Sequence, residues 1–265
     1  MKLGLVVGGG NLPLNIIREN KDIDFYIVMV KGFANADNYK MYKNISVSFG
    51  QIGKALSFFK KNDVKNIVFA GAVKQPHYRN ILPDWTGFFL LLKLLKLKFF
   101  GDNNVLMEVI KYMENKGFNI LPADKFLKNK VVKGFIGNIK FKDDYRIDVE
   151  LGVKILNTLS SFDIGQSIVI QNGKVIGLEC VEGTANLIKR CKDLKFAKGR
   201  GAILVKMKKE TQTDKADLPV IGVDTIRQLK DSEFCGVVID TNGIIIDFDK
   251  TIEEANKNNI FVFGY

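Results

Sequence analysis

The sequence predicts an α/β protein of two domains, a Rossmann-like N-terminal domain and a mixed α+β C-terminal domain, with a ligand crevice between them. The chain has 265 residues, which is near the size at which one hydrophobic core divides into two. Apolar strand-like runs alternate with helix-like runs in the first half, whereas hairpin signals mark the second half. A lysine-rich passage at 128–142 separates the halves, so we predict domains at 1–132 and 133–265.

Glycine turns follow two of the expected strands in the first half. We expect strands at 2–8, 24–30, 45–47, 66–70 and 118–121, and helices at 14–20, 53–61, 85–100 and 105–116. The first strand runs into Gly9, Gly10 and Asn11, and the strand at 66–70 ends at Gly71. Ligands of open α/β sheets bind at this edge, where glycine lets backbone amides approach an anion, so we expect the two turns to face one crevice. The spacing is not G-x-G-x-x-G, and plain tight turns are the alternative.

Two Asn-Gly pairs in the second half predict hairpins, one at Asn172-Gly173 and one at Asn242-Gly243. The other expected elements are helices at 144–159, 182–190, 224–230 and 250–258 and strands at 202–205 and 261–263. The order strand, strand, helix, strand then occurs twice, which hints at an internal repeat.

The loop at 206–222 combines several lysines, including Lys206, with isolated carboxylates between two apolar elements. Lysines neutralise a phosphate and a carboxylate binds a metal or orients water, so the loop suits phosphate chemistry; a solvated charged loop is the alternative. Glu182 and Thr184 flank Gly183 at an expected helix start, where an anion or a magnesium-bound phosphate is favoured. A simple helix start explains them equally, and capping alone would explain Asp102 or Asn103.

The net charge of +11 is concentrated in the first half. Residues 1–130 hold 20 Lys+Arg and 10 Asp+Glu, and residues 131–265 hold 20 and 19. A basic half beside an acid-bearing half fits an anionic ligand or a membrane with anionic head groups. Nucleic acid is the competing partner, but no nucleic-acid-binding motif supports it. The three cysteines lack metal-ligand spacing, which is typical of reduced residues in a cytosolic protein.

Residues 85–100 form an apolar stretch that three lysines interrupt. The apolar runs are too short to span a bilayer. The stretch predicts either a buried or dimer-forming helix or a helix that lies on a membrane surface.

Six motifs together resemble one enzyme family over nearly the whole chain. They are Gly8-Gly9-Gly10-Asn-Leu-Pro13, Phe69-Ala-Gly71-x-Val73-x-x-Pro76, Gly101-Asp102, Asp163-Ile-Gly-Gln166, Glu182-Gly-Thr184 and Asp217-Leu-Pro-x-Ile-Gly222. In this order and spacing they are similar to the UDP-2,3-diacylglucosamine pyrophosphatases of lipid A biosynthesis that are unrelated to the metallophosphoesterase type. Each motif alone is weak, and the set is far more specific.

The resemblance implies magnesium-dependent hydrolysis of UDP-2,3-diacylglucosamine to UMP and 2,3-diacylglucosamine 1-phosphate, with the substrate held by both domains. It implies that Asp217 is catalytic. Our hypothesis from the residues is that Glu182 and Thr184 contact the metal or phosphate, which makes Asp217 and Glu182 the candidate Mg²⁺ ligands. The candidate substrate-binding residues are Gly9, Gly10, Asn11, Gly71, Asp102, Asn103, Gln166, Gly183, Lys206 and Gln212.

Two positions depart from the family pattern. Ala185 stands where the family usually has aspartate, and Lys215 stands where it often has arginine. The missing carboxylate either moves the expected metal contact to Glu182 or Glu179 or means that this position only caps the helix. Lysine keeps the charge of arginine but not its bidentate grip on phosphate. We expect a cytoplasmic protein that is peripheral at the inner membrane, with a homodimer as a further option and no nucleic-acid partner. A basic nucleotide- or nucleic-acid-binding module without catalysis is the alternative function.

Overall fold

The chain folds into two compact units. The computed structural model describes residues 1–73, 83–96, 102–141, 143–162, 164–209, 215–216 and 218–265, without the side chains of 94–96, 102–104 and 143. The first unit comprises Met1–Lys128 and Thr213–Asp217, and the second comprises Asn129–Gln212 and Leu218–Tyr265. The predicted boundary at 132 placed residues 213–217 in the C-terminal domain, whereas they belong to the first unit.

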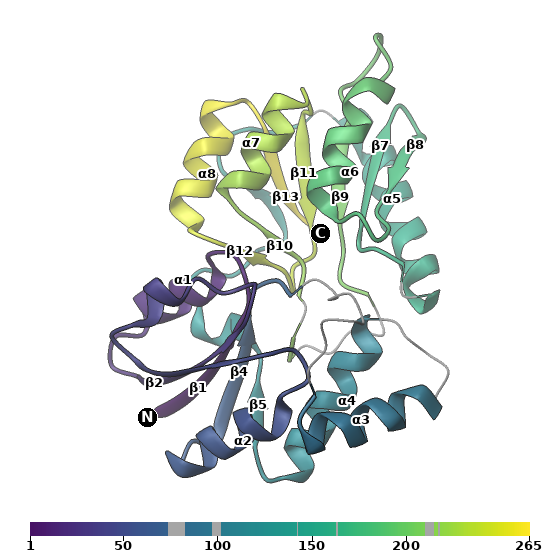
Figure 1. The fold of residues 1–265 in the computed structure, drawn as a ribbon. Helices are drawn as coiled ribbons and strands as arrows, with labels where there is room; N and C mark the ends of the chain where they lie inside the picture. The colour runs from purple at the N-terminus through teal and green to yellow at the C-terminus, as the bar shows by residue number, and fades with distance from the viewer. Residues whose placement is uncertain (74–82, 97–101, 142, 163, 210–214, 217) are drawn as a thin grey trace. The chain divides into compact units, whose positions relative to one another are not determined.

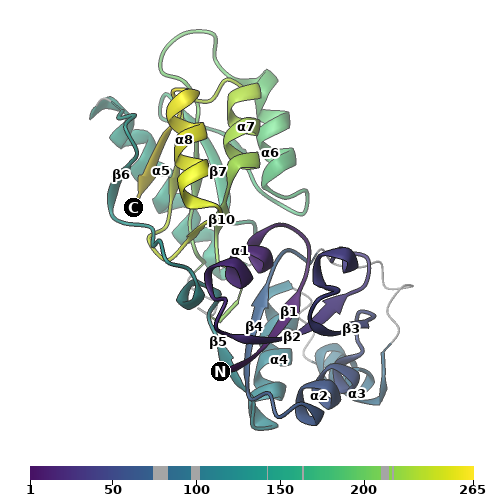
Figure 2. The same ribbon diagram turned by 90° about the vertical axis from the view of Figure 1, so that its left-hand side faces the viewer.

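A parallel sheet of five strands, in the order β3-β2-β1-β4-β5, forms the centre of the first unit (Figure 2). Its strands are β1 (Lys2–Val7), β2 (Asp24–Val30), β3 (Lys43–Val47), β4 (Asn66–Ala70) and β5 (Asn119–Leu121). Its helices are α1 (Leu12–Glu19), α2 (Ile52–Lys61), α3 (Trp85–Lys96) and α4 (Asp102–Asn115). β1 lies between β2 and β4, so the strand order reverses there, and the predicted Rossmann-like sheet is confirmed.

The helices α2 and α4 cover one face of this sheet. Phe59 of α2 and Ile110 of α4 share a buried cluster with Tyr26, Val28 and Ile67 of the strands. Tyr26 and Val28 are two positions apart, so their side chains point to the same face of β2. The amphipathic pattern of the helices therefore supplies the apolar layer that this face requires.

A mixed sheet of six strands, in the order β6-β13-β11-β9-β7-β8, forms the centre of the second unit. Its strands are β6 (Gly134–Ile136), β7 (Ser167–Gln171), β8 (Lys174–Leu178), β9 (Ile203–Lys206), β11 (Gly236–Ile239) and β13 (Phe261–Gly264). β9, β11 and β13 are parallel, whereas β7 runs antiparallel to β8 and β9, and β6 runs antiparallel to β13. The predicted mixed α+β architecture is confirmed.

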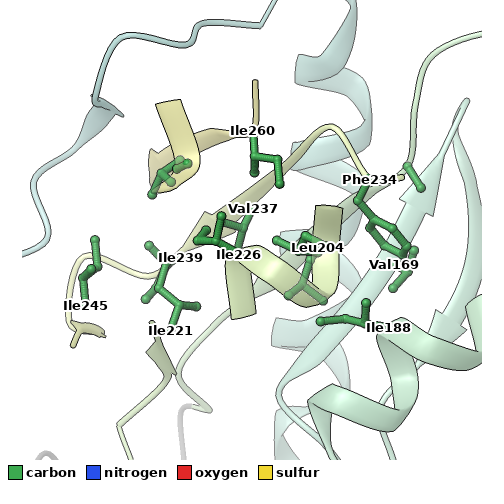
Figure 3. Packing of buried hydrophobic residues seen from close by; sticks show 14 of the residues in the cluster. Val169, Ile188, Leu204, Ile221, Ile226, Phe234, Val237, Ile239, Ile245 and Ile260 are labelled. Atoms are coloured by element: carbon green, nitrogen blue, oxygen red, sulfur yellow. The ribbon is translucent and has the colours of Figure 1, made fainter. Parts of the chain in front are cut away.

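Helices lie on both faces of the mixed sheet (Figure 1). They are α5 (Arg146–Leu159), α6 (Thr184–Cys191), α7 (Val223–Asp231) and α8 (Phe248–Lys257). The helices α6, α7 and α8 pack on one face, where Figure 3 shows Ile188 and Ile226 beside Leu204 and Val237. The helix α5 packs on the other face against the alternate residues of the same strands. The sheet is consequently buried on both sides.

The two Asn-Gly pairs have different outcomes. The first hairpin is confirmed, because β7 pairs with β8 and both Asn172 and Gly173 have positive φ, at 54° and 72°. The second hairpin is wrong. After Gly243 the strand β12 (Ile244–Ile245) pairs in parallel with β10 (Val220–Ile221) and not with β11. The order of elements recurs in this half, but the strand pairing does not.

Residues 215 and 216 are anchored in the first unit. Ala216 is buried in the cluster that α2 and α4 form on the parallel sheet. The Lys215 ammonium makes an ion pair with Glu114 of α4. Among the described residues no helix is both long and apolar enough to cross a membrane.

Candidate active site

The two glycine turns of the first unit meet at the carboxyl edge of its sheet. β1 and β4 are neighbours, and Val7 lies opposite Ala70 at their ends. The Gly9 amide donates to the Ala72 carbonyl at 2.8 Å, and the Ala72 amide donates back to the Gly9 carbonyl at 2.9 Å. These turns follow the two strands at which the sheet order reverses, which is the usual ligand position in such sheets.

Gly71 has a φ of +94°, and a Cβ there would lie 2.6 Å from the Gly9 carbonyl oxygen. Only glycine fits this close approach of two backbones. Gly10 has a φ of +85° and open space where a Cβ would stand. Asn11 occupies the N-cap of α1 but makes no side-chain cap hydrogen bond. Gly9, Gly10, Asn11 and Gly71 therefore come together as predicted from their strand ends, and their contact with substrate stays a prediction.

We expect Gly71→Ala to lower the free energy of unfolding by about 2–4 kcal/mol, because strain at positive φ and overpacking against Gly9 add together. Gly32→Ala is the matched control, since Gly32 has a φ of +84° and a Cβ added there would meet nothing within 4 Å. The control should cost only about 1–2 kcal/mol. Urea unfolding of both variants measures the difference, and equal losses would show that the contact with Gly9 is unimportant.

A buried lysine lies at the carboxyl edge of the sheet in the second unit. Lys206 ends β9 and is only 7% exposed. Its Nζ donates to the Thr184 hydroxyl at 2.8 Å, and that hydroxyl donates to Glu179 Oε1 at 2.8 Å. Ser167 Oγ lies 3.2 Å from the same Thr184 oxygen. A buried cation thus shares a hydroxyl bridge with a buried carboxylate.

The fold brings these four side chains together from separate segments. Ser167 begins β7 and lies opposite Lys206 in the sheet. Glu179 follows β8, where its amide donates to the Ser167 carbonyl at 2.8 Å, and Thr184 begins α6. Sequence reasoning selected Lys206 and Thr184 and offered Glu179 as an alternative metal contact, but it missed their partner Ser167. No local signal marks Ser167, since single polar residues at strand ends are common.

Two further residues of this edge contact the cluster through the backbone. The Gln166 amide donates to Glu179 Oε2 at 3.2 Å, and the buried Gln166 Oε1 has no hydrogen-bond partner within the described part of the chain. Asp240 follows β11 and is 9% exposed. Its amide donates to the Lys206 carbonyl at 3.0 Å, and its carboxylate accepts the Lys208 amide at 3.1 Å. Asp240 is a second carboxylate at this edge that the motifs did not indicate.

Glu182 is engaged at the start of α6 rather than in the lysine cluster. Its Oε1 accepts from Arg190 Nη2 at 2.8 Å, and its Oε2 accepts from the Cys180 amide at 3.1 Å. A hydrogen bond from its own backbone amide, together with Arg190 and Cys180, lowers the pKa of Glu182. Gly183, with a φ of +79°, is the N-cap residue of α6. This geometry fits the helix-start alternative for Glu182, while its predicted catalytic role has not been tested.

We expect Glu182→Gln to lower the free energy of unfolding by at most ~1 kcal/mol at neutral pH, because the ion pair is partly solvated. The folded-state pKa is depressed, so the stabilisation is present above the ordinary value of 4.5 and is lost as the pH falls through the folded-state pKa. Wild type and variant should therefore converge in acid when urea unfolding is compared across pH. A gap that persists below the folded-state pKa would contradict this origin.

The described residues do not by themselves form a protein metal site. Among them no group of three or more His, Cys, Asp or Glu side chains is placed to hold an ion. Glu182, one of the two predicted ligands, is already bound by Arg190, and Asp217 lies outside the described residues. Gln212 also lies outside them, as do the side chains of Asp102 and Asn103, although both residues belong to the first turn of α4.

Two family models cover the chain almost from end to end. The LpxI N-terminal domain matches residues 2–130, and the LpxI C-terminal domain matches residues 132–263. The chain belongs to the LpxI family. An LpxI relative from Caulobacter vibrioides (strain ATCC 19089 / CIP 103742 / CB 15), named UDP-2,3-diacylglucosamine pyrophosphatase LpxI, is 28% identical over 99% of this chain and 97% of its own.

Solved structures resemble this LpxI chain only distantly. CobK precorrin-6A reductase is 11% identical with a TM-score of 0.30, over 100% of this chain and 88% of that one. N5-carboxyaminoimidazole synthetase from Staphylococcus aureus is 17% identical with a TM-score of 0.21, over 73% of this chain and 44% of that one.

Proposed function

We propose that the protein hydrolyses the diphosphate bond of UDP-2,3-diacylglucosamine and releases UMP and 2,3-diacylglucosamine 1-phosphate in lipid A biosynthesis. Membership of the LpxI family and the name of the Caulobacter relative support this substrate. The structural observation that carries the proposal is the buried Lys206 ammonium at the carboxyl edge of the second sheet. We place the reaction in the cytoplasm.

Lys206 is suited to bind a diphosphate oxygen. A lysine side chain is long and flexible, but here the Thr184 hydroxyl holds the ammonium group at 2.8 Å. Because the residue is almost wholly buried, its charge acts through a medium of lower dielectric constant than water. A fixed cation of this kind stabilises negative charge that develops on phosphate oxygens in the transition state.

Glu179 serves as a positioning residue in this proposal. Thr184 has one hydroxyl proton, and Glu179 Oε1 accepts it at 2.8 Å. The lone pairs of the Thr184 oxygen are then directed to the donors Lys206 and Ser167. The backbone amide of Gln166 holds the other Glu179 oxygen, so the carboxylate is fixed on both sides. With this arrangement of donors and acceptors, Thr184 positions the Lys206 ammonium group by accepting its hydrogen bond.

The glycine edge of the first unit would bind the nucleotide part of the substrate. Gly10 exposes a backbone without a side chain at the start of α1, where amide groups favour an anion. We further propose that Asp217 orients the attacking water, as the family resemblance implies. The carboxylate would accept a proton from that water as it attacks phosphorus.

Magnesium fits this chemistry as an ion that arrives with the substrate. Mg²⁺ in proteins is commonly bound by one or two carboxylates together with substrate phosphates, so a cage of three protein ligands is not required. Asp217 is the carboxylate of this chain that we propose for that contact. When bound, the ion would neutralise charge on the diphosphate.

The deciding experiment incubates the purified protein with UDP-2,3-diacylglucosamine, either with Mg²⁺ or with EDTA, and measures UMP and the lipid monophosphate. We expect both products with Mg²⁺ and neither with EDTA. Equal release under both conditions would remove the metal from the proposal. No release by folded protein would contradict the reaction and favour the basic binding module, for which a steep salt dependence of RNA or DNA binding is the separate check.

A further inference from the structure

The helix α3 presents an apolar face to solvent. Trp85 is 81% exposed, Phe88 42%, Phe89 64% and Leu92 40%. These four residues, which we call the α3 apolar face, are spaced i, i+3, i+4 and i+7 and therefore lie along one side of the helix. Surface helices normally place polar residues on the exposed side, so this arrangement is the reverse of the expected pattern.

Packing on the opposite side fixes the orientation of α3. Leu90 is 6% exposed, and Gly87 is buried so close to the backbone of Gly50 that a Cβ would lie 1.8 Å from the Gly50 carbonyl oxygen. At the start of α3, the Asp84 carboxylate accepts the amides of Gly87 and Lys54, each at 2.9 Å. The helix cannot rotate its apolar face inward without losing these contacts. A shallow hollow beside it is lined by Pro83, Asp84, Trp85 and Phe88.

Positive charge accompanies the α3 apolar face. Lys93 follows Leu92 and its side chain is 63% exposed, with its Nζ 2.6 Å from Glu108 Oε2. Across residues 85–101 the sequence has three lysines and no acidic residue. Residues 1–130 as a whole carry an excess of ten positive charges over negative ones. An occupant of this surface would therefore combine apolar chains with negative charge.

We propose that the α3 apolar face docks on an anionic lipid membrane. Tryptophan and phenylalanine favour the boundary between head groups and acyl chains, and the exposed Lys93 beside the face is attracted by anionic head groups. A second copy of this chain would bring like charges together, which makes it the weaker occupant. The docking concerns a surface and goes beyond the hydrolysis proposed above, so each can fail without the other.

Trp85 is the only tryptophan of the protein, so its fluorescence reports on this face alone. We expect the full-length protein to show a blue-shifted emission, and quenching by brominated acyl chains, when phosphatidylglycerol vesicles are added. Vesicles of phosphatidylcholine should give a much smaller change, and high salt should weaken the effect of the anionic vesicles. An emission that stays unchanged with phosphatidylglycerol vesicles would overturn the proposal.

A double variant and a control variant distinguish membrane binding by the α3 apolar face from non-specific adsorption through any exposed phenylalanine. Phe88→Gln with Phe89→Gln should reduce vesicle partitioning at least about tenfold, because two apolar anchors are lost. Phe162→Gln is the control, since Phe162 is 70% exposed in the second unit, and it should partition like wild type. Circular dichroism confirms that each variant is folded. Equal partitioning of the double variant and wild type would contradict the proposal.

Charge reversal tests the contribution of Lys93. Lys93→Glu should lower partitioning to phosphatidylglycerol vesicles about tenfold, whereas Lys40→Glu should have little effect. The two lysines are matched, because Lys40 is also exposed and lies 2.6 Å from the acid Asp37.

Two outcomes would assign the face to another occupant. A blue shift that depends on protein concentration without lipid would indicate a second copy. A blue shift with a monomeric short-chain diacylglucosamine phosphate, and none with vesicles, would indicate the acyl chains of a single ligand. Either result overturns membrane docking.

Discussion

Asp217→Asn is expected to reduce kcat for UDP-2,3-diacylglucosamine by about 10³-fold, within the range of roughly 10²–10⁴ that a positioned acid or base contributes. The amide keeps the shape of the carboxylate but can neither accept the proton of water nor neutralise a cation. The backbone on either side is held by the fold, since Ala216 is buried in the first unit and Leu218 is 8% exposed in the second. The loss should therefore appear without a change in folding.

The control for this variant is Asp214→Asn, which removes a carboxylate of the same type three residues earlier. Steady-state rates and thermal unfolding are measured for both proteins. We expect Asp214→Asn to keep most of its activity. If both variants lose activity equally, the negative charge of the loop matters rather than the Asp217 carboxylate. If Asp217→Asn keeps turnover within a few-fold of wild type, Asp217 is not the catalytic residue.

Lys206→Met should reduce kcat/KM by about 10²–10³-fold, because one fixed group that stabilises transition-state charge is worth that factor. Methionine retains the apolar stem that packs at the buried end of β9. Lys189→Met is the matched control, since Lys189 is an exposed lysine on α6. Rates of both variants should be compared at saturating and limiting substrate. A Lys206→Met enzyme with wild-type kcat/KM would exclude this lysine from the reaction.

Removing the Thr184 hydroxyl should lower kcat/KM by a smaller factor than removing Lys206. Thr184→Val removes the oxygen that accepts from Lys206 and donates to Glu179, with almost no change in volume. Losing one hydrogen bond to a charged group costs about 1.5–3 kcal/mol, so kcat/KM should fall roughly tenfold or more. In a Lys206→Met background the same change should have little further effect, because the two residues act as a unit. Additive losses would contradict the positioning role.

The sequence predicted the architecture where local signals agree with long-range pairing. Asn172-Gly173 joins two strands that pair with each other, and both residues adopt the positive φ that this turn needs. Asn242-Gly243 has the same local signal, but β11 already pairs with β9 and β13 on both sides. The Asp240 carboxylate also accepts the Asn242 amide at 2.8 Å, which favours a different turn. The same Asn-Gly dipeptide therefore forms a hairpin turn only where the flanking strands can pair with each other.

The candidate site was predictable only in part. Glycine at strand ends indicated the edge of the first sheet, because turn geometry is a local property. Ser167 was missed, and Glu179 was offered only as an alternative metal contact, since the roles of both come from contacts with Thr184 that no local pattern shows. The anchoring of Ala216 in the first unit was missed for the same reason: an alanine in a charged loop carries no signal of burial.

The return of residue 216 to the first unit affects how the protein can be synthesised and divided. A ribosome releases 1–128 first, but that segment cannot complete its core until residues 129–212 have emerged and Ala216 follows. Both units are discontinuous in sequence, because a short segment of the first lies between the two parts of the second. Cutting the gene at the apparent boundary would leave the N-terminal fragment without Ala216 and the ion pair of Glu114 with Lys215. The N-terminal unit therefore completes its core only after most of the C-terminal unit has been synthesised, although each unit has its own sheet.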